Sequence, residues 1–405
     1  MSEELLRKLK ANFSENELID IIGGLVKIPS HPGIENQESG VAQLIYKIFK
    51  KEGIDAEIIP VVDGRSNVVA TIKGTGKGKT LLLTGHTDTV PPYDMAGNPY
   101  EVRMSDGKMY GRGVLDMKGP LGCMMMAMIS IKRSGIELPG DIVFAGLIDE
   151  EDKSEGTRAL LNRGIKADGA IVGEPSEMEI CLGHRGLEWF EFSFHGKTVH
   201  GGKQKEGINA ILMATKFINR VERDLIPKIE KRVHKIAGSS SMNYGYIKGG
   251  TQPSTVAGEC MLQIDRRWIP GEKFIDIVAE YQQILDELHE EDPKFKGSFK
   301  VMDVSAMSDD YIHEALEIET EAPVVVSCSQ AISNVTGQGA KYTSFTAWTD
   351  GGLISSYGKI PTIVLGPGNL ESAHSAGEYI DIKALVPAAL IYALTAVEFC
   401  SQRTE

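Results

Sequence analysis

The chain has 405 residues, of which 42% are hydrophobic and 24% are charged, as in an ordinary soluble globular protein. This length exceeds what a single hydrophobic core usually holds, so we expect two domains. The formal net charge of −13 at pH 7 argues against nucleic acid or an anionic membrane as the main partner.

The cysteines and the apolar segments indicate a cytoplasmic protein without a membrane anchor. Five cysteines are scattered along the chain and none forms a C-x-x-C pair, which favours reduced thiols. The N-terminal segment "MSEELLRKLKANFSENELIDIIGGLV" is charged and amphipathic, unlike a secretory signal. The apolar stretch "ALVPAALIYALTAVEF" is shorter than a membrane span and contains Pro387.

Residues 1–185 alternate between helix-like and strand-like segments. A helix is predicted over 36–53, where apolar residues recur at helical spacing and Gly53 can end the helix. The segments predicted as strands include "DAEIIPVV", "SNVVATIKG", "KTLLLTGH", "GDIVFAGLIDEE" and "ADGAIVGEPS". This alternation is typical of α/β proteins.

The segment 74–80, "GTGKGKT", is similar to a phosphate-binding loop but is one residue shorter than that motif. A strand follows it, whereas a phosphate-binding loop leads into the N-terminus of a helix. We therefore interpret this segment as a turn that joins two antiparallel strands.

From residue 186 the pattern changes to the order β-α-β-β-α-β, which describes a compact two-layer α+β module. After residue 307 the α/β pattern returns. We therefore expect one discontinuous domain, formed by residues 1–185 and 308–405, with a second domain inserted at 186–307.

Side chains suited to metal binding follow the ends of the apolar strands in the α/β part. They are His86 and Asp88 after "TLLL", Asp116 in "GRGVLDMKG", Asp149, Glu150, Glu151 and Asp152 after "DIVFAGLI", Glu174 after "GAIV", and His374 after "TIVL". Ligands bind at this edge of open α/β sheets. Each motif alone has an ordinary alternative, such as a solvated acidic turn for "DEED". Together, such carboxylates would repel one another unless cations lay among them. Histidine and carboxylate ligands suit a pair of zinc ions.

The ordered motifs "GHTDTVP", "GRGVLDMKG", "DEE", "GEPS" and "AHSAGEY" resemble a known enzyme family. It is the M20-type family of co-catalytic zinc peptidases and deacylases, which includes acetylornithine deacetylase, succinyl-diaminopimelate desuccinylase, aminoacylase and carboxypeptidase G. The resemblance runs from about residue 15 to residue 395. It implies a zinc-peptidase-like α/β catalytic domain with a mixed sheet, and an inserted α+β domain that acts as a lid and in dimerisation.

The resemblance also implies a ligand set for two Zn²⁺ ions, with Co²⁺ or Mn²⁺ as possible substitutes. His86 and Glu174 would bind one ion, Glu151 and His374 would bind the other, and Asp116 would bridge the two. The family often has a cis peptide bond directly after the bridging aspartate. Asp88 would orient His86, since residues two apart on a strand share a face.

Three further residues have roles that the resemblance implies. Glu150 would be the general base, although the residues alone leave Asp149 and Asp152 open as rivals. His200, in "TVHGG", would reach the site of a partner subunit in a homodimer and stabilise the oxyanion. Arg267 would bind a substrate carboxylate; Arg266 competes with it, and the strand's parity decides between them.

The sequence thus predicts a metal-dependent hydrolase that cleaves the amide between an acyl group and an amino acid. A dipeptidase or carboxypeptidase with the same machinery is the alternative. A non-catalytic metal-binding protein is disfavoured because no ligand or base is missing. Asp350 and the backbone of "VLGPG" are lesser candidates for the site.

Overall fold

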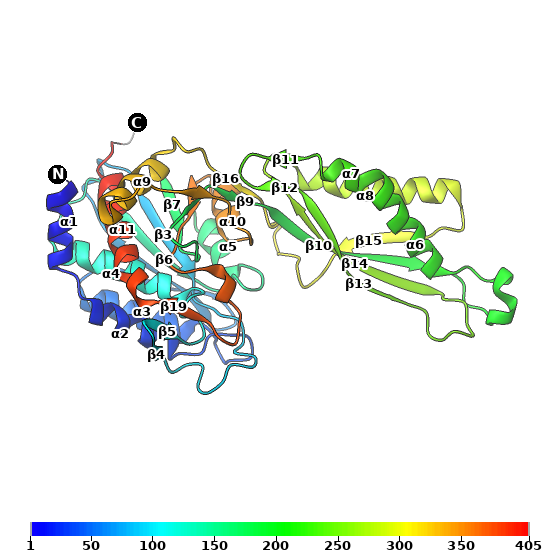
Figure 1. The fold of residues 1–405 in the computed structure, drawn as a ribbon, viewed down its shortest axis with the longest axis horizontal. Helices are drawn as coiled ribbons and strands as arrows, with labels where there is room; N and C mark the ends of the chain where they lie inside the picture. Colours follow the sequence, from blue (N-terminus) through cyan, green and yellow to red (C-terminus); the bar gives the residue numbers. More distant parts are fainter. Residues whose placement is uncertain (1, 404–405) are drawn as a thin grey trace. The chain divides into compact units, whose positions relative to one another are not determined.

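The computed structural model describes residues 2–403 and divides the chain into two compact units (Figure 1). Residues up to Gly183, together with those from Leu316 onward, form the first unit, and His184–Ala315 form the second. The second unit extends past the predicted end at residue 307. The reason is that residues after 307 stay hydrogen-bonded to its sheet, as shown by Leu187 N–H, which donates to the His313 carbonyl at 3.0 Å.

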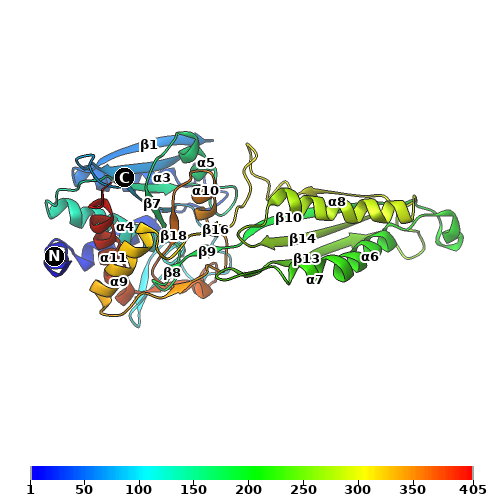
Figure 2. The ribbon, with the colours of Figure 1, turned by 90° about the horizontal axis from the view of Figure 1, so that it is seen from above.

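The first unit is built on an eight-stranded mixed sheet, which confirms the predicted fold class (Figure 2). The central pairs β6–β3, β3–β7 and β7–β18 are parallel, whereas β1–β2, β2–β6 and β18–β8 are antiparallel. In spatial order the strands are β1 (Asp55–Val62), β2 (Arg65–Ile72), β6 (Ile142–Leu147), β3 (Leu81–His86), β7 (Gly169–Val172), β18 (Thr362–Val364), β8 (Ile180–Cys181) and β17 (Tyr342–Thr343).

Helices cover both faces of this sheet. On one face, Val143 and Ala145 pack in a cluster with Leu160 of α5 and Ile354 of α10. On the other face, Phe144 contacts Phe49 of α3 edge to face. The helices of this unit are α1 (Ser2–Ala11), α2 (Glu15–Val26), α3 (Ser39–Lys51), α4 (Lys118–Arg133), α5 (Glu155–Asn162), α9 (Pro323–Thr336), α10 (Gly351–Ser356) and α11 (Ile382–Cys400), with the 3₁₀ turn η3 (Leu370–Ser372).

Segment 74–80 joins β2 and β3, which run in opposite directions as predicted, but the two strands are not neighbours and the segment is not a hairpin turn. Strands β2 and β3 lie on opposite sides of β6, and the segment must pass the end of β6 to connect them. Its backbone pairs with distant parts of the chain: Lys77 N–H donates to the Pro139 carbonyl at 2.9 Å and Lys79 N–H to the Gln402 carbonyl at 3.0 Å. Long-range pairing replaces the local turn.

Helix α11 is longer than the apolar stretch that the sequence suggests. It has 19 residues and is long and apolar enough to cross a membrane by length and composition alone. In the structure, 67% of its most apolar window is buried. Tyr392, near its middle, is buried and donates a hydrogen bond to the Leu365 carbonyl at 2.6 Å. This burial is typical of a core helix in a globular protein.

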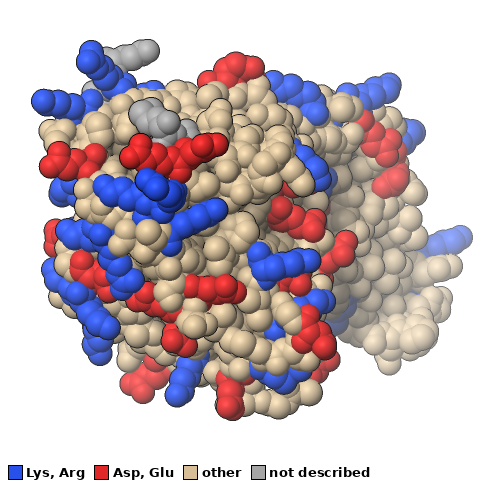
Figure 3. Space-filling model, turned by 60° about the vertical axis from the view of Figure 1, so that its left-hand side comes forward, with Lys and Arg blue, Asp and Glu red and all other residues tan. Residues whose placement is uncertain are grey.

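Basic and acidic side chains are interspersed over the face shown in Figure 3. In the first unit, Arg133 of α4 pairs with Glu17 of α2 and with Glu52, each at 2.7 Å. Exposed pairs of this kind contribute about 0–1 kcal/mol each. The folding free energy of this unit therefore depends mainly on its buried sheet and helices.

A small three-stranded sheet in the first unit is important for the site. It has the order β19–β5–β4, with β4 (Arg103–Ser105), β5 (Lys108–Tyr110) and β19 (Tyr379–Asp381). Tyr110, the last residue of β5, pairs with Tyr379, the first residue of β19. The segment that follows β5 and the segment that precedes β19 therefore lie at the same end of this strand pair.

The second unit is a four-stranded antiparallel sheet covered on one face by helices. Phe190, Phe192 and Phe194 alternate along β10 and pack in one cluster with Phe217 of α6 and Tyr281 of α8. In spatial order the strands are β13 (Ser241–Gly249), β14 (Glu259–Trp268), β10 (Gly186–His195) and β15 (Gly297–Val301); the helices are α6 (Ala210–Arg220), α7 (Ile226–Ile229) and α8 (Phe274–Glu291). The remaining short elements are β9 (Gly183–His184), β11 (Val233–His234), β12 (Gly238–Ser239), β16 (Leu316–Glu317), η1 (Gly201–Glu206) and η2 (Val221–Leu225).

Candidate metal centre

Five predicted ligand side chains of the first unit converge beyond the carboxyl ends of the central strands. His86 is the last residue of β3, Glu151 and Glu174 follow β6 and β7, and His374 follows β18. Asp116 comes from the loop between β5 and α4. Parallel strands end at the same edge of the sheet, so residues far apart in sequence meet there.

Asp116 lies between two groups of side chains. His86 Nε2 is 2.9 Å from Asp116 Oδ1 and 3.4 Å from Glu174 Oε1. His374 Nε2 is 3.0 Å from Asp116 Oδ2 and 2.9 Å from Glu151 Oε1. Each carboxylate oxygen of Asp116 therefore faces a different histidine. The peptide bond between Asp116 and Met117 is cis, as the family resemblance implies.

The donor atoms of these two groups fit divalent cations. Ligand atoms of His86, Asp116 and Glu151 all lie within 4.8 Å of one another. Within residues 2–403, Glu174 Oε1 is buried and has no hydrogen-bond partner. Its contact with His86 at 3.4 Å is not a hydrogen bond, and a buried carboxylate oxygen without a hydrogen bond is unfavourable unless a cation approaches it. Imidazole nitrogen and carboxylate oxygen are donors that zinc accepts.

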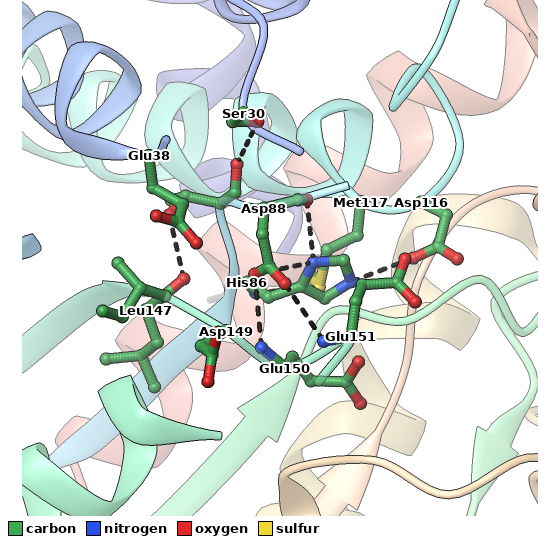
Figure 4. Close-up of polar contacts among 12 residues, drawn as sticks. Ser30, Glu38, His86, Asp88, Asp116, Met117, Leu147, Asp149, Glu150 and Glu151 are labelled. Carbon is green, nitrogen blue, oxygen red and sulfur yellow. Dashed lines mark hydrogen bonds and ion pairs between the residues drawn. The ribbon is translucent and has the colours of Figure 1, made fainter. Parts of the chain in front are cut away.

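Asp88 holds both His86 and the turn that carries the two glutamates (Figure 4). The His86 ring Nδ1 is 3.0 Å from the Asp88 backbone carbonyl, so Nδ1–H donates there and Nε2 is left to face Asp116. The Asp88 carboxylate is farther from this ring, at 3.5 Å. Its oxygens accept the N–H groups of Glu150 at 3.3 Å and Glu151 at 3.0 Å. Asp88 therefore orients the histidine mainly through its backbone.

Strand β2 holds the same turn from the other side. Asn67 accepts the N–H of Ile148 at 3.0 Å and donates to the Gly156 carbonyl at 2.8 Å, which closes the segment 148–156. Arg65 pairs with Asp149 at 2.6 Å, and Asp149 has the left-handed backbone angle φ of 72°. A non-glycine residue keeps that conformation only where its surroundings hold it.

These contacts separate the candidates for the general base. Asp149 is committed to Arg65, and Asp152 is exposed. The Glu150 side chain makes no hydrogen bond or ion pair with a residue of the described part of the chain. Burial raises the pKa of Glu150 well above its ordinary value; the charge of His86 opposes this, and the charges of Glu174, Asp350 and Glu151 add to it.

The histidines of the metal-free centre hold protons strongly. Burial disfavours the charged imidazole of His86, but Glu174, Asp116 and Asp88 outweigh it and raise its pKa well above the usual value. The bonds from His374 to Asp116 and Glu151 raise the pKa of His374 to about 10. Metal-free protein at neutral pH therefore carries protons where a metal would bind.

The lesser candidates have structural partners. Asp350 is buried and accepts a hydrogen bond from Thr157 at 2.5 Å; burial raises its pKa to about 6. In "VLGPG", the Gly366 N–H donates to the Ser176 hydroxyl at 3.1 Å, and the Gly366 carbonyl accepts the Ser176 N–H at 3.0 Å. We interpret both as parts of the scaffold.

The second unit contains the other predicted residues. His200 is exposed and its Nδ1 accepts the N–H of Gly202 at 3.1 Å. Arg266 is buried on the helix-covered face of β14 and pairs with Glu272 at 3.0 Å. Arg267 points to the opposite face, where 29% of its side chain is exposed and it pairs with Asp265 at 3.0 Å.

Several residues that surround the proposed ligands were not predicted from the sequence. Arg65, Asn67 and Glu38, which pairs with Arg65, stand in none of the quoted motifs and gave no signal. Arg112 and Glu378 stand within the quoted motifs "GRGVLDMKG" and "AHSAGEY". A charged side chain next to a proposed ligand, in a glycine-rich segment, could have indicated that these two residues belong to the site.

Residues 82–398 match the sequence profile of the peptidase family M20/M25/M40. The chain belongs to this family. Members of the M20 family hydrolyse amide bonds, so this chain is an amide hydrolase.

Two relatives and one solved structure show what this M20 protein is similar to. It is 31% identical to an N-formyl-4-amino-5-aminomethyl-2-methylpyrimidine deformylase of Halalkalibacterium halodurans, over 95% of this chain and 94% of the relative. It is 29% identical to an acetylornithine deacetylase of Proteus mirabilis, over 90% and 91%. The fold is that of aminopeptidase PepT of Bacillus cereus, with a TM-score of 0.79 and 22% identity over 96% of this chain and 99% of that one.

Proposed function

We propose that this M20 protein is a metal-dependent deacylase that hydrolyses the amide between an acyl group and an amino acid. The observation that carries the proposal is the shared Asp116 carboxylate, with a histidine and a further glutamate on each side of it and Glu150 beside them. The deformylase and deacetylase among its relatives support removal of an acyl group from an amine.

We propose that the centre holds two Zn²⁺ ions. His86 and Glu174 would hold one, Glu151 and His374 the other, and Asp116 would bridge them. Three carboxylates carry three negative charges and two divalent cations carry four positive charges. The proposed centre therefore keeps one net positive charge. When bound, the ions supply Lewis acidity that lowers the pKa of water and polarises the amide carbonyl.

Glu150 is the proposed general base and acid. Its carboxylate has no competing hydrogen bond in the described chain, so it can accept and donate a proton. It takes a proton from the attacking water and delivers it to the leaving amine. Asp88 and Asn67 keep the turn fixed, so that the Glu150 side chain stays in place.

Metal binding is expected to release protons and to tighten as the pH rises toward about 10, the pKa of His374 in the metal-free protein. A coordinating imidazole must be neutral, so below that pKa the metal displaces a proton. Each displaced proton changes the apparent affinity by about tenfold per pH unit. Titration calorimetry at about pH 6.5 and about pH 8.5, in two buffers of different ionisation enthalpy, measures the number of protons released and the metal affinity. Equal affinities at the two pH values would contradict this proton count.

Arg267 is the proposed contact for a substrate carboxylate. Burial and the charge of Arg267 lower the pKa of Arg185, while Asp265 opposes them, so the two arginines lie close enough to interact. Arg267→Ala is expected to raise KM about 10–100-fold for substrates with a carboxylate, as for a lost charged hydrogen bond. Arg266→Ala is expected to cost about 3–5 kcal/mol in the free energy of unfolding, since it leaves Glu272 without this partner. Kinetics and urea unfolding of both variants distinguish the two arginines, and the reverse pattern would exchange their roles.

We propose a homodimer formed through the second unit, in which His200 acts at the partner's centre. Strand β13 is an edge of the four-stranded sheet, and its Tyr246 and Ile247 are exposed, as is Leu212 of α6. An unpaired edge with exposed apolar residues favours association. Ile247→Asp with Leu212→Asp is expected to give a monomer in sedimentation and to lose most activity. A monomer that keeps its rate while His200→Ala loses it would refute action across the dimer.

The five cysteines are buried, and none of them forms a disulfide within residues 2–403. A cytoplasmic location, where thiols stay reduced, is our proposal.

The test of the proposed function is hydrolysis of a substrate panel by metal-reconstituted protein, with the bound metal measured alongside. N-acetyl, N-formyl and N-succinyl amino acids are compared with dipeptides and tripeptides. The proposal expects the highest kcat/KM among acyl amino acids. Higher kcat/KM for peptides would favour the alternative of a dipeptidase or carboxypeptidase. This is the second candidate because the fold is shared with a peptidase, the aminopeptidase PepT.

A further inference from the structure

Glu378 lies where two ligand-bearing segments of the first unit leave the small sheet. The segment 111–117 follows β5 and carries Asp116, and the segment 371–378 precedes β19 and carries His374. Pairing of Tyr110 with Tyr379 brings these two segments to the same end of the β5–β19 pair.

One oxygen of Glu378 holds the backbone of the Asp116 segment. Glu378 Oε1 accepts the N–H of Gly113 at 2.9 Å, of Leu115 at 3.0 Å and of Asp116 itself at 3.2 Å. Three amides directed at one carboxylate oxygen fix the path of the segment and thereby the point from which the Asp116 side chain starts. The Glu378 side chain is fully buried, so water does not compete for these amides.

The other oxygen connects to the His374 segment through an arginine. Arg112 Nη1 donates to Glu378 Oε2, and Arg112 Nη2 donates to the Ser375 carbonyl at 3.4 Å. His374, directly before Ser375, has the left-handed backbone angle φ of 58°. A histidine keeps that conformation only where neighbours hold it, and the arginine contact is such a neighbour.

We propose that Glu378 is a positioning residue that, through Arg112, sets Asp116 and His374 relative to each other for metal binding. This inference rests on the proposed function. The hydrogen bonds of the Glu378 side chain go to Arg112 and to backbone amides, so it acts on the backbone of one proposed ligand and on the segment of another. Residues that support metal ligands in this way typically change metal affinity about 10–100-fold when they are replaced.

The test compares Glu378→Gln with the wild-type protein and with Glu371→Gln. Glutamine has nearly the shape of glutamate, but its NH₂ group cannot accept a hydrogen bond, so either the three amides or Arg112 lose their partner. Glu371 is an exposed carboxylate of the same segment, so Glu371→Gln removes the same charge without these contacts. Zinc affinities by chelator competition, metal content and steady-state kinetics are measured on each protein.

For Glu378→Gln we expect at least one of the two zinc affinities to fall about 10–100-fold. At saturating zinc, kcat is expected to fall while KM stays close to the wild-type value, since the inference concerns the centre and not the substrate contact. Glu371→Gln is expected to match the wild type. If Glu378→Gln does not fold, Arg112→Lys replaces it, because lysine keeps the charge but loses the two-pronged contact.

Zinc affinities of the folded variant within about threefold of the wild type would overturn the inference, as would an equal loss in Glu371→Gln. The two proposals fail differently. Wild-type protein that binds no divalent metal overturns the proposed function and this inference with it. Wild-type protein that binds two metals, together with a variant that binds them equally well, overturns the positioning role alone.

Discussion

Replacing Glu150 with glutamine is expected to lower kcat by about 10²–10⁴-fold while both metals stay bound. The amide cannot accept the proton of the attacking water, yet the five proposed ligands are unchanged. The backbone of Glu150 would keep its hydrogen bond to Asp88, so the turn and Glu151 should stay in place. Steady-state kinetics and elemental analysis of the same samples measure the two quantities.

The matched control for this variant is Asp152→Asn, which removes an exposed acid of the same turn and should leave kcat unchanged. Loss of a metal from Glu150→Gln would mean that Glu150 is a ligand and that the roles of the adjacent glutamates must be exchanged. An unchanged kcat would mean that a residue other than Glu150 accepts the proton.

Asp116→Ala is expected to remove both metals and to abolish activity. Its two oxygens face His86 and His374 separately, so a single truncation takes one ligand atom from each group. Bound metal supplies several kcal/mol of transition-state stabilisation, and about 1.4 kcal/mol corresponds to tenfold in rate. We therefore expect kcat/KM to fall by at least about 10³-fold.

The control is Asp106→Asn, an exposed acid in the turn between β4 and β5 of the same segment, which should keep its metal and its rate. Elemental analysis after gel filtration counts the ions. An Asp116→Ala protein that retains one tightly bound ion and a measurable rate would show that the two groups are independent and that the carboxylate is not shared.

Local patterns in the sequence predicted some features of the fold, whereas contacts between distant residues left no such pattern. The strand ends could be predicted because an apolar run that stops at a polar or glycine-rich segment is a local pattern, and His86 and Glu174 follow such runs. Segment 74–80, which joins two antiparallel strands that are not neighbours, shows the limit of this reasoning. Two consecutive strands can be antiparallel without being neighbours, and only the insertion of β6 between them reveals this.

The side chains proposed as ligands follow predicted strands or stand in quoted motifs, but the residues that hold them could not be predicted from the sequence. Arg65 contacts Asp149 and Glu378 contacts the Asp116 segment across large separations in sequence. A hydrogen bond between distant residues leaves no periodic signal in a single sequence. The choice between Arg266 and Arg267 was open for the same reason. Neighbouring residues of a strand point to opposite faces of the sheet, but the sequence does not say which face the helices cover.

The strand–helix alternation, the change to an α+β pattern near residue 186 and the types of side chain at the strand ends could be inferred from the amino-acid sequence, because they depend on local spacing and chemistry. That each oxygen of Asp116 faces a different histidine, and that Glu378 and Arg112 connect the segments of Asp116 and His374, became visible in the folded chain alone. Such contacts exist only after the sheet has brought its strand ends together, so their geometry is a property of the folded chain.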